Sequence, residues 1–249
     1  MTSKKLATLI VFPFAALLAQ ADTPHTGREV LERMHAAYDG QWYRTLSFAQ
    51  KTVRFTAAGE RRAQSWHEYL RWTPERGTEL RIDIGDASAG NNIRYTADSS
   101  WRYSAGKLAG HDANGNAFLP LIEGVYVQPV ERTIADLAST HVDLSKVSTQ
   151  TWNGRSVWVV GALAASDTLS PQFWVDPDKK ILVRMILSFG AGRPPADVRL
   201  DDYVIVTGGM LATRVTMLSN GLPLQTEEYA DWKTGAAIPD STFAIKPLP

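Results

Sequence analysis

Apolar residues occupy every second position through much of the chain, and most regularly between Gln172 and Ser219. The apolar runs in this stretch are separated by turn residues, among them Asp176-Pro177 and Gly208-Gly209. Successive side chains of a β-strand point to opposite faces of the sheet, so an alternating run gives its strand one apolar face. The pattern therefore predicts a meander of antiparallel strands whose apolar face is buried against another part of the protein.

Further alternating runs occur outside this meander. One group lies between Thr45 and Leu108, and a second group begins after Val147 with a hairpin at the Asn153-Gly154 turn. Short turns join each run to the next, as they do in a meander. We count about 10–12 strands in all, which predicts a mainly β protein.

Two segments have helical periodicity instead. Thr26 and Glu29 match a capping box, in which the two side chains satisfy free backbone donors, and apolar residues then follow at helical spacing until Asp39. Pro129 suits the first turn of a second amphipathic helix, which we expect to end near His141. This second helix falls between the two groups of strands.

The segment from Leu108 to Gln128 interrupts the alternation. Residues 110–116 have the composition of a loop, and apolar side chains are then crowded into residues 117–127. Two interpretations fit this pattern equally. Residues 117–127 are either a mobile lid or a helical segment packed permanently on the sheet.

The first residues match a secretory signal peptide. Lys4-Lys5 precedes the apolar run Leu6–Leu18, and Ala19-Gln20-Ala21 provides a small-residue cleavage site. The apolar run is shorter than the roughly 18 residues that a membrane-spanning helix needs. We therefore expect export to the periplasm, cleavage after Ala21, and one domain made of residues 22–249 without stable insertion into a membrane. The chain has no cysteine, so we expect no disulfide in this domain.

Composition and motifs argue against several classes of function. Acidic and basic residues number 26 each and form no basic run, which argues against nucleic acid as a partner. The sequence has no nucleophile elbow, no phosphate-binding loop and no pair of histidines at metal-ligand spacing. Adjacent acids such as Glu227-Glu228 point to opposite faces of a strand, so they cannot share a catalytic site. We expect no enzymatic activity, no cofactor and no metal.

Four short motifs, together with the order of the elements, resemble the LolA/LolB-like superfamily of lipoprotein-sorting proteins. The motifs that resemble the family's R-x-D strand, W-x-Y hairpin, W-x-D turn and closing I-P segment are Leu80-Arg81-Ile82-Asp83, Trp101-Arg102-Tyr103, Phe173-Trp174-Val175-Asp176 and Ile238-Pro239 through Phe243. The resemblance spans most of residues 22–249. It implies an open antiparallel half-barrel with an N-terminal helix and a helical insertion that covers the concave face.

The tryptophans permit two interpretations. All eight lie after the signal peptide, mostly in the strand runs, where they either fill an ordinary core or line an incompletely filled cavity. The family resemblance favours a cavity for acyl chains, because each methylene removed from water contributes about 0.8 kcal/mol. The candidate lipid-binding residues of this cavity or its lid are Trp66, Leu70, Leu80, Ile82, Trp101, Tyr103, Phe118, Leu121, Ile122, Trp158 and Trp174.

We therefore expect a periplasmic carrier that binds the acyl chains of a lipid or lipoprotein, in outer-membrane lipoprotein sorting or related envelope lipid transport. Its partners would include membrane-associated envelope proteins. The alternative hypothesis is a non-enzymatic envelope sensor or scaffold module that binds a protein partner through the open sheet. Lipid that copurifies with the protein from the periplasm would distinguish the carrier from this alternative.

The signal-peptide assignment makes a prediction about processing. Because Ala19-Gln20-Ala21 is the small-residue site that follows the apolar run, the exported protein should begin at Asp22. Intact-mass measurement of the protein from a periplasmic extract tests this expectation. An exported form that retains Met1 would contradict the assignment.

Overall fold

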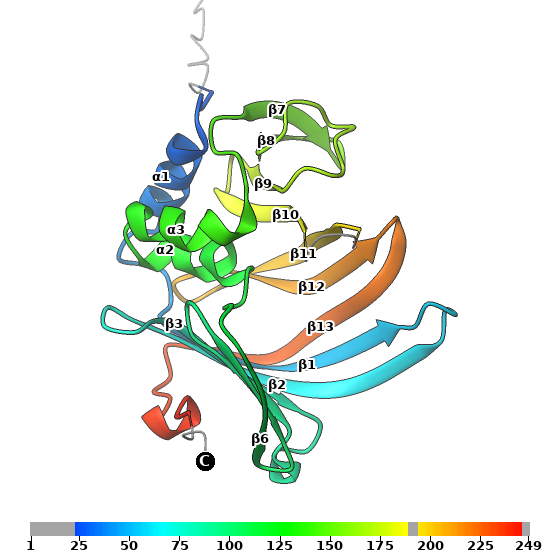
Figure 1. Ribbon diagram of the computed structural model, residues 1–249. Coiled ribbons are helices and arrows are strands. Elements are labelled where there is room, and N and C mark those ends of the chain that lie inside the picture. Colours follow the sequence, from blue (N-terminus) through cyan, green and yellow to red (C-terminus); the bar gives the residue numbers. More distant parts are fainter. Residues whose placement is uncertain (1–22, 189–193, 246–249) are drawn as a thin grey trace, which may run out of the picture.

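The computed structural model describes residues 23–188 and 194–245 of the 249-residue chain. The expected signal peptide and its cleavage site lie outside these residues. Thirteen antiparallel strands form a single sheet (Figure 1). The strands of the first half are β1 (Thr45–Phe55), β2 (Arg61–Thr73), β3 (Gly77–Ile84), β4 (Asn92–Tyr95), β5 (Ser100–Ser104) and β6 (Lys107–Asp112). The strands of the second half are β7 (Val147–Trp152), β8 (Arg155–Val160), β9 (Gln172–Asp176), β10 (Ile181–Leu187), β11 (Ala196–Val206), β12 (Gly209–Ser219) and β13 (Leu222–Thr234).

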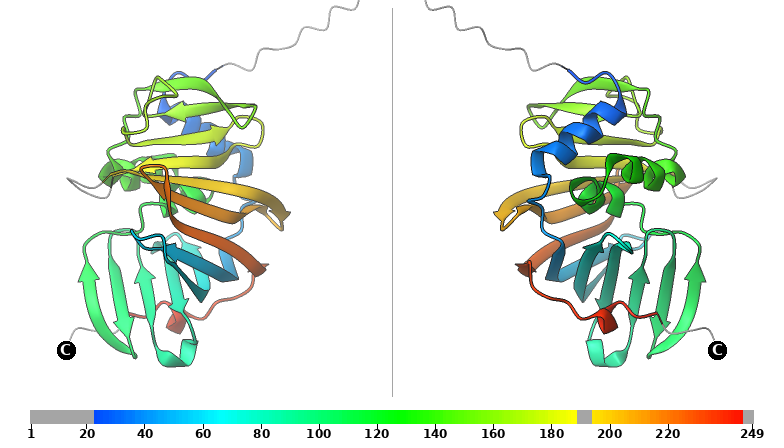
Figure 2. Two further views of the ribbon diagram at one scale, coloured as in Figure 1. Left: turned by 90° about the vertical axis from the view of Figure 1, so that its right-hand side faces the viewer. Right: turned by 90° about the vertical axis from the view of Figure 1, so that its left-hand side faces the viewer.

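The sheet is built from two meanders. Across it the strands follow the order β6-β5-β4-β3-β2-β1-β13-β12-β11-β10-β9-β8-β7, so the meanders meet at a central seam where β1 pairs with β13. The edge strands β6 and β7 do not pair with each other within the described residues, and the sheet stays open. Figure 2 shows this curved sheet from two sides. The arrangement confirms the expected open antiparallel half-barrel.

Helices occur before the sheet and between its two meanders. Helix α1 (Gly27–Tyr38) begins at Thr26, whose hydroxyl accepts a hydrogen bond from the Glu29 N–H at 3.2 Å, as the capping-box motif predicts. The Glu29 carboxylate in turn accepts a hydrogen bond from the backbone N–H of His25 at 2.8 Å. The 3-10 turn η1 (Ala87–Ala89) links β3 to β4. The connection between the meanders contains η2 (Pro120–Gly124, a π-helical turn), α2 (Val125–Val127), α3 (Val130–Leu137) and η3 (Ala138–Thr140).

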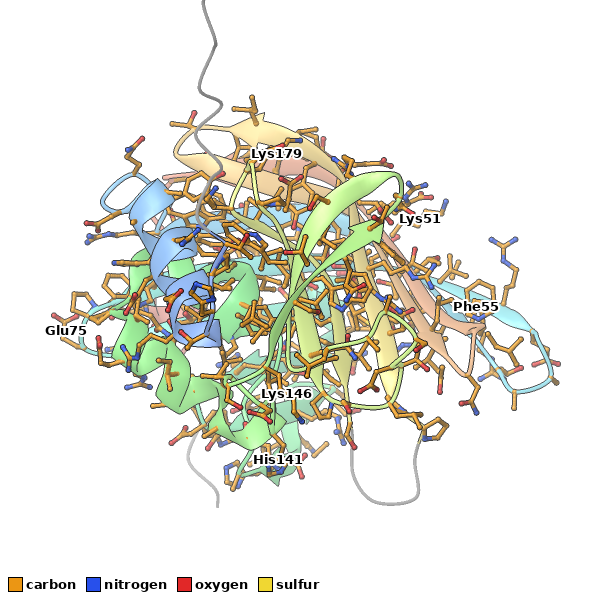
Figure 3. The ribbon with its side chains drawn as sticks, turned by 90° about the horizontal axis from the view of Figure 1, so that it is seen from above. Lys51, Phe55, Glu75, His141, Lys146 and Lys179 are labelled. Atoms are coloured by element: carbon orange, nitrogen blue, oxygen red, sulfur yellow. The ribbon has the colours of Figure 1, made fainter. Side chains whose placement is uncertain are left out.

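This connection passes from one edge of the sheet to the other. Residues 113–146 leave β6, run over the concave face and enter β7 (Figure 1). Helix α1 packs beside α2 and α3 on the same face (Figure 3). Leu121 and Val125 of the connection are fully buried and belong to the same apolar core as Leu31 and Met34 of α1. The helical insertion therefore covers part of the concave face, as the family resemblance implies.

Strands β9 and β10, and β8 from Val157 to Val160, are buried on both faces. All five residues of β9 and all seven of β10 are buried. Helix α1 contacts β8 on one side, and Val159 and Trp174 belong to a second apolar cluster on the other side. The guanidinium of Arg184 lies 4.6 Å and 4.4 Å from the ring centroids of Trp152 and Trp174, and it donates two hydrogen bonds to Asp197. These side chains bury the outer face of this part of the second meander.

The closing segment of the chain packs on the outer face of the first meander. Turn η4 (Asp240–Thr242) precedes Phe243, a buried ring whose centroid lies 4.5 Å from the guanidinium of Arg71. Arg71 also forms ion pairs with Glu79 of β3 and with Asp240. Because Arg71 follows Leu70 in the strand, it points away from the concave face. One arginine of β2 therefore binds both the neighbouring strand and the C-terminal segment.

Strand β6 is the element that the sequence does not predict, and it brings the number of strands to thirteen. It lies partly in the stretch that was expected to be a loop, and its side chains are small or polar except for the half-buried Leu108. As an edge strand, β6 pairs only with β5 in the described structure. Backbone hydrogen bonds define such a strand, so side-chain periodicity does not reveal it.

A buried carboxyl group ties the helical connection to the start of the sheet. The Glu123 carboxylate accepts hydrogen bonds from the indole N–H of Trp42 at 2.8 Å and from the hydroxyl of Tyr43 at 3.0 Å. Both partners precede β1, so this contact joins η2 to the chain that enters the centre of the sheet. Burial raises the pKa of Glu123 to about 8, although the two hydrogen bonds oppose the shift.

This raised pKa predicts a pH-dependent stability. The folded protein holds a proton on Glu123 up to about pH 8, whereas the unfolded chain releases it near the ordinary value of 4.5, so this group lowers stability progressively between these limits. The substitution Glu123→Gln removes the titration and keeps polar atoms beside Trp42 and Tyr43. In urea unfolding at about pH 5 and about pH 8, the variant should gain stability relative to wild type by up to about 1.4 kcal/mol per pH unit.

Glu228→Gln is the matched control for this measurement. Glu228 is an exposed carboxylate of β13 that pairs with Lys51 at 3.1 Å. Its removal should leave the wild-type pH dependence unchanged. A stability difference between Glu123→Gln and wild type that stays constant with pH would contradict the prediction.

Candidate functional site: a cavity under the helical connection

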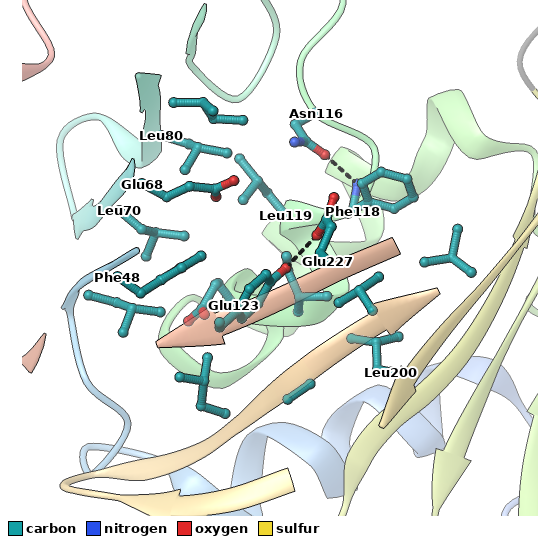
Figure 4. Close-up of a pocket in the computed structure, with 18 of the residues that line it drawn as sticks. Phe48, Glu68, Leu70, Leu80, Asn116, Phe118, Leu119, Glu123, Leu200 and Glu227 are labelled. Atoms are coloured by element: carbon teal, nitrogen blue, oxygen red, sulfur yellow. Dashed lines mark hydrogen bonds between the residues drawn. The ribbon is translucent and has the colours of Figure 1, made fainter. Parts of the chain in front are cut away.

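A cavity of about 270 Å³ lies between the concave face of the sheet and the helical connection (Figure 4). Its volume is close to the lower end of the range for small-ligand pockets, about 300–1,000 Å³. Most of its lining is apolar. The first meander and the residues before it contribute Trp42, Tyr43, Leu46, Phe48, Arg54, Trp66, Glu68, Leu70, Leu80, Ile82, Ile93 and Tyr95. The connection contributes Asn116, Phe118, Leu119, Ile122, Glu123 and Tyr126. The second meander contributes Met185, Val198, Leu200, Tyr203, Met210, Leu211, Ala212, Val215, Met217, Gln225, Glu227 and Tyr229.

Strand register places the side chains of the first meander in rows that cross β1 to β4. Residues in register on neighbouring antiparallel strands point to the same face, so alternation along each strand and pairing between strands together build one wall. The first row comprises Leu46, Leu70, Leu80 and Tyr95, and the second comprises Phe48, Glu68, Ile82 and Ile93. Glu68 is thus the one acidic member of two otherwise apolar or aromatic rows.

The second meander continues the wall by the same rule. One row comprises Met185, Val198 and Met217, and the next comprises Leu200, Val215 and Glu227. Glu227 ends its row beside the seam, because the following partner across the sheet is Thr52 of β1. Each meander therefore has one acid in an apolar row: Glu227 stands next to the seam, and Glu68 is separated from the seam by Phe48.

The roof of the cavity is the segment 116–126. Asn116 Oδ1 accepts a hydrogen bond from the Phe118 N–H at 3.0 Å, where the chain turns into this segment. Phe118 and Ile122 are half-buried and line the cavity. Side chains four residues apart share one face of a helical turn, so these two point the same way. Leu121 is fully buried and packs into the core of the connection instead.

The structure brings together six of the candidate lipid-binding residues named from the sequence. Those that line the cavity are Trp66, Leu70, Leu80, Ile82, Phe118 and Ile122. They come from β2, β3 and the connection. Their shared position follows from the two cross-strand rows and from the roof above them.

The other five candidates lie outside the cavity wall. Leu121 is in the core of the connection, and the ring of Trp158 lies under the cations Arg33 and Lys180. Trp174 belongs to the outer apolar cluster. The two aromatic residues of β5 are in register with polar residues of the outer face of β4, so Trp101 and Tyr103 also point outward. Alternation identifies the residues that share a face of one strand, but it does not identify the concave face.

Glu68 places a carboxyl group inside the apolar cavity. The residue is 9% exposed, and its carboxyl group points into the cavity (Figure 4). Within the described residues it forms no hydrogen bond and no ion pair. Burial raises the pKa of Glu68 well above its ordinary value, and the charge of Glu227 adds to this shift.

Glu227 is equally buried but has partners. Its carboxylate accepts hydrogen bonds from the Tyr229 hydroxyl at 2.7 Å and from the Gln225 amide at 2.5 Å. Burial raises the pKa of Glu227, while these hydrogen bonds and the charge of Arg54 oppose the shift. Arg54 is exposed at the rim, donates a hydrogen bond to Gln225 at 2.9 Å and lies 5.0 Å from the ring centroid of Trp66.

Sequence reasoning missed both acids, although each left a signal. Glu68 stands between Trp66 and Leu70 on the same face of β2, so it breaks an apolar pattern. Glu227 attracted notice only beside Glu228, which indeed points outward. Only the pairing of β1 with β13 brings Glu227 into the same cavity as Glu68.

The side chains that line the cavity determine what it can bind. In this part of the chain, no group of three or more His, Asp or Glu side chains is arranged to hold a metal ion. None of the helices in the described ranges is long and apolar enough to cross a membrane. The cavity offers apolar walls for a hydrocarbon chain and a carboxyl group for a polar atom next to that chain.

Comparisons with known proteins give matches at the level of structure. A scan against protein-family models finds no match, and a search of curated protein sequences finds none either. A domain from Vibrio parahaemolyticus, described as an outer membrane lipoprotein-sorting protein, has a TM-score of 0.60 and 13% identity over 87% of this chain and 95% of its own. A DUF1329 family protein from Desulfovibrio piger also has a TM-score of 0.60 and 13% identity, over 88% of this chain and 95% of its own.

A LolA superfamily protein from Nitrosomonas europaea resembles the chain as well. It has a TM-score of 0.54 and 13% identity, over 88% of this chain and 98% of its own. Identity this low shows a shared fold and does not by itself show a shared function. The open sheet of two meanders, the N-terminal helix and the helical connection over the concave face agree with this likeness. The chain therefore has a LolA-like fold.

Proposed function

We propose that the protein is a non-catalytic carrier of the cell envelope that binds an acyl chain of a lipid or lipoprotein. The observation that carries this proposal is the unfilled apolar space between the two meanders and the helical connection. Each methylene that leaves water for such a space contributes about 0.8 kcal/mol, so a single chain supplies useful affinity.

The proposed place of action is the periplasm, which the chain would reach by means of its signal peptide. The similar fold of a domain described as lipoprotein-sorting supports a role in outer-membrane lipoprotein sorting or related envelope lipid transport. A carrier receives its cargo from one membrane and delivers it to another. Its proposed partners are therefore membrane-associated envelope proteins.

In this proposal the roof of the cavity is a lid. A chain that enters the space must displace the side chains that close it, and Phe118 and Ile122 are half-buried groups of the roof. Leu121 holds the same segment to the core, since it is 0% exposed. In this proposal the roof moves while Leu121 stays anchored in the core.

Leu121 and Ile122 allow a matched test, because they are neighbours with different surroundings. Ile122→Ser removes apolar contact with a bound chain, so a fluorescent acyl probe should bind roughly tenfold more weakly while the protein stays folded. Leu121→Ser places a hydroxyl and a void in the core, and should lower the free energy of unfolding by roughly 2–5 kcal/mol. Fluorescence titration and urea unfolding measure the two effects.

Two results would contradict these expectations. A folded Ile122→Ser protein that binds the probe as tightly as wild type would show that the roof is not part of the ligand site. If the wild-type protein binds no acyl probe and copurifies with no lipid, the carrier proposal is wrong. A module that binds a protein partner through its open sheet would then replace it.

A further inference from the structure

Glu68 is an unpartnered acid in an apolar row. Its neighbours in register are Phe48 of β1 and Ile82 of β3, and Trp66 and Leu70 share its face of β2. It is nine-tenths buried, points into the cavity (Figure 4), and has neither a hydrogen bond nor an ion pair among the described residues. A carboxyl group held among apolar side chains without a protein donor costs free energy unless a partner in the cavity satisfies it. A residue that weakens the fold at the wall of a cavity points to a role in binding.

Most hydrogen-bonding groups near it are either engaged or acceptors; the exception is the hydroxyl of Tyr95 on β4, which lines the same cavity and has no hydrogen bond among the described residues. On β13, Tyr229 and Gln225 already donate to Glu227. On β1, the amide nitrogen of Gln50 donates within its own strand at 2.8 Å, and its amide oxygen is buried without a partner. Between these strands and β3, Glu68 adds a carboxyl group that has no protein partner in the described part of the chain, and this group accepts hydrogen bonds in either protonation state. A ligand group that donates hydrogen bonds satisfies the open oxygens of Glu68 and Gln50.

The acidic groups that line the cavity disfavour an anionic ligand group, since such a ligand would raise the cost of ionising any of them. Glu68, Glu123 and Glu227 all line it, whereas Arg54 is exposed at the rim and already bonded to Gln225. A carboxylate or phosphate beside Glu68 would add negative charge to a site where two acids already interact. A cation or a neutral donor would instead fill the open acceptors with charge-assisted or ordinary hydrogen bonds.

We propose that Glu68 recognises the polar group of a single-chain amphiphile, and that this group is a hydrogen-bond donor, an ammonium or a hydroxyl, rather than an anion. This inference rests on the proposed uptake of an acyl chain. The chain lies against the apolar rows of the wall, and the donor at its end satisfies the carboxyl group of Glu68. The ammonium and the hydroxyl are two sources of the same chemistry, which the experiment separates.

Four ligands with a dodecyl or dodecanoyl chain distinguish the contribution of the polar group to affinity from that of the chain. Dodecylamine carries an ammonium, dodecanol a hydroxyl, methyl dodecanoate no donor, and dodecanoate a negative charge. Each competes with a fluorescent acyl probe for the mature protein near neutral pH. At least one of the two donor ligands should bind about tenfold more tightly than methyl dodecanoate, and dodecanoate should bind more weakly than methyl dodecanoate.

Variants of Glu68 assign the preference to its carboxyl group. Glu68→Gln keeps an acceptor but no charge, so it should remove a preference for dodecylamine and retain one for dodecanol. Glu68→Leu removes both acceptors and should bind the donor ligands no more tightly than methyl dodecanoate. Glu228→Gln makes the same charge change on the outer face, where Glu228 pairs with Lys51, and should keep the wild-type order.

The unfolding temperature of Glu68→Leu distinguishes a role in ligand recognition from a role in stabilising the fold. Because Glu68→Leu removes an unpartnered buried acid, the variant should unfold at a higher temperature than wild type. A lower unfolding temperature would mean that the carboxyl group supports the fold, and would overturn its assignment to ligand recognition.

Methyl dodecanoate reports on the chain site alone. If neither this ester nor the probe binds, the proposed function and the present inference are both wrong. If the ester and the probe both bind, the proposed function stands. The inference is then wrong if dodecanoate competes with the probe as strongly as dodecylamine and dodecanol do. It is also wrong where Glu68→Leu retains the wild-type order of affinities.

Discussion

The fold depends on a topological constraint: the chain must pass from one edge of an open sheet to the other. The first meander runs outward from the central seam to β6, and the second begins at the opposite edge with β7. The connection between them crosses on the concave side, where apolar side chains require cover from water (Figure 1). The segment that completes the topology therefore also forms the roof of the cavity.

The cavity lies between a part of the sheet that is buried on both faces and a part whose apolar side chains are mainly on the concave face. In β8 to β10 both faces are covered, one by the core that includes α1 and the other by the cluster around Trp174. In β1 to β4 the concave face is mainly apolar, while the outer face carries ion pairs such as that of Arg71 with Glu79. Strands β8 to β10 thus form the most extensively buried part of the sheet. In β1 to β4 the connection covers the apolar rows only in part, and the uncovered part of these rows lines the cavity.

The acids of the cavity differ in what they contribute. Glu123 has both carboxylate oxygens bonded, to Trp42 and Tyr43, and so holds the roof to the start of the sheet. Glu68 has no such partners among the described residues, although it is buried to a similar degree. A core selected only for stability would carry an apolar side chain there, because a buried acid without donors opposes folding.

The sequence by itself determined the local structure of this protein. Period-two alternation is a property of a single strand and the capping box of a single helix end, so most strands and the start of α1 at Thr26 could be predicted, and the order of elements indicated the fold. The tertiary structure decided which face is concave, which is why Trp66 lines the cavity and Trp101 does not. It also decided the pairing of β1 with β13 and the edge strand β6, neither of which has a local pattern. Glu68 and Glu227 share one cavity for this reason: pairing between distant segments is set by backbone hydrogen bonds and by packing of the whole sheet, and no short stretch of sequence contains that information.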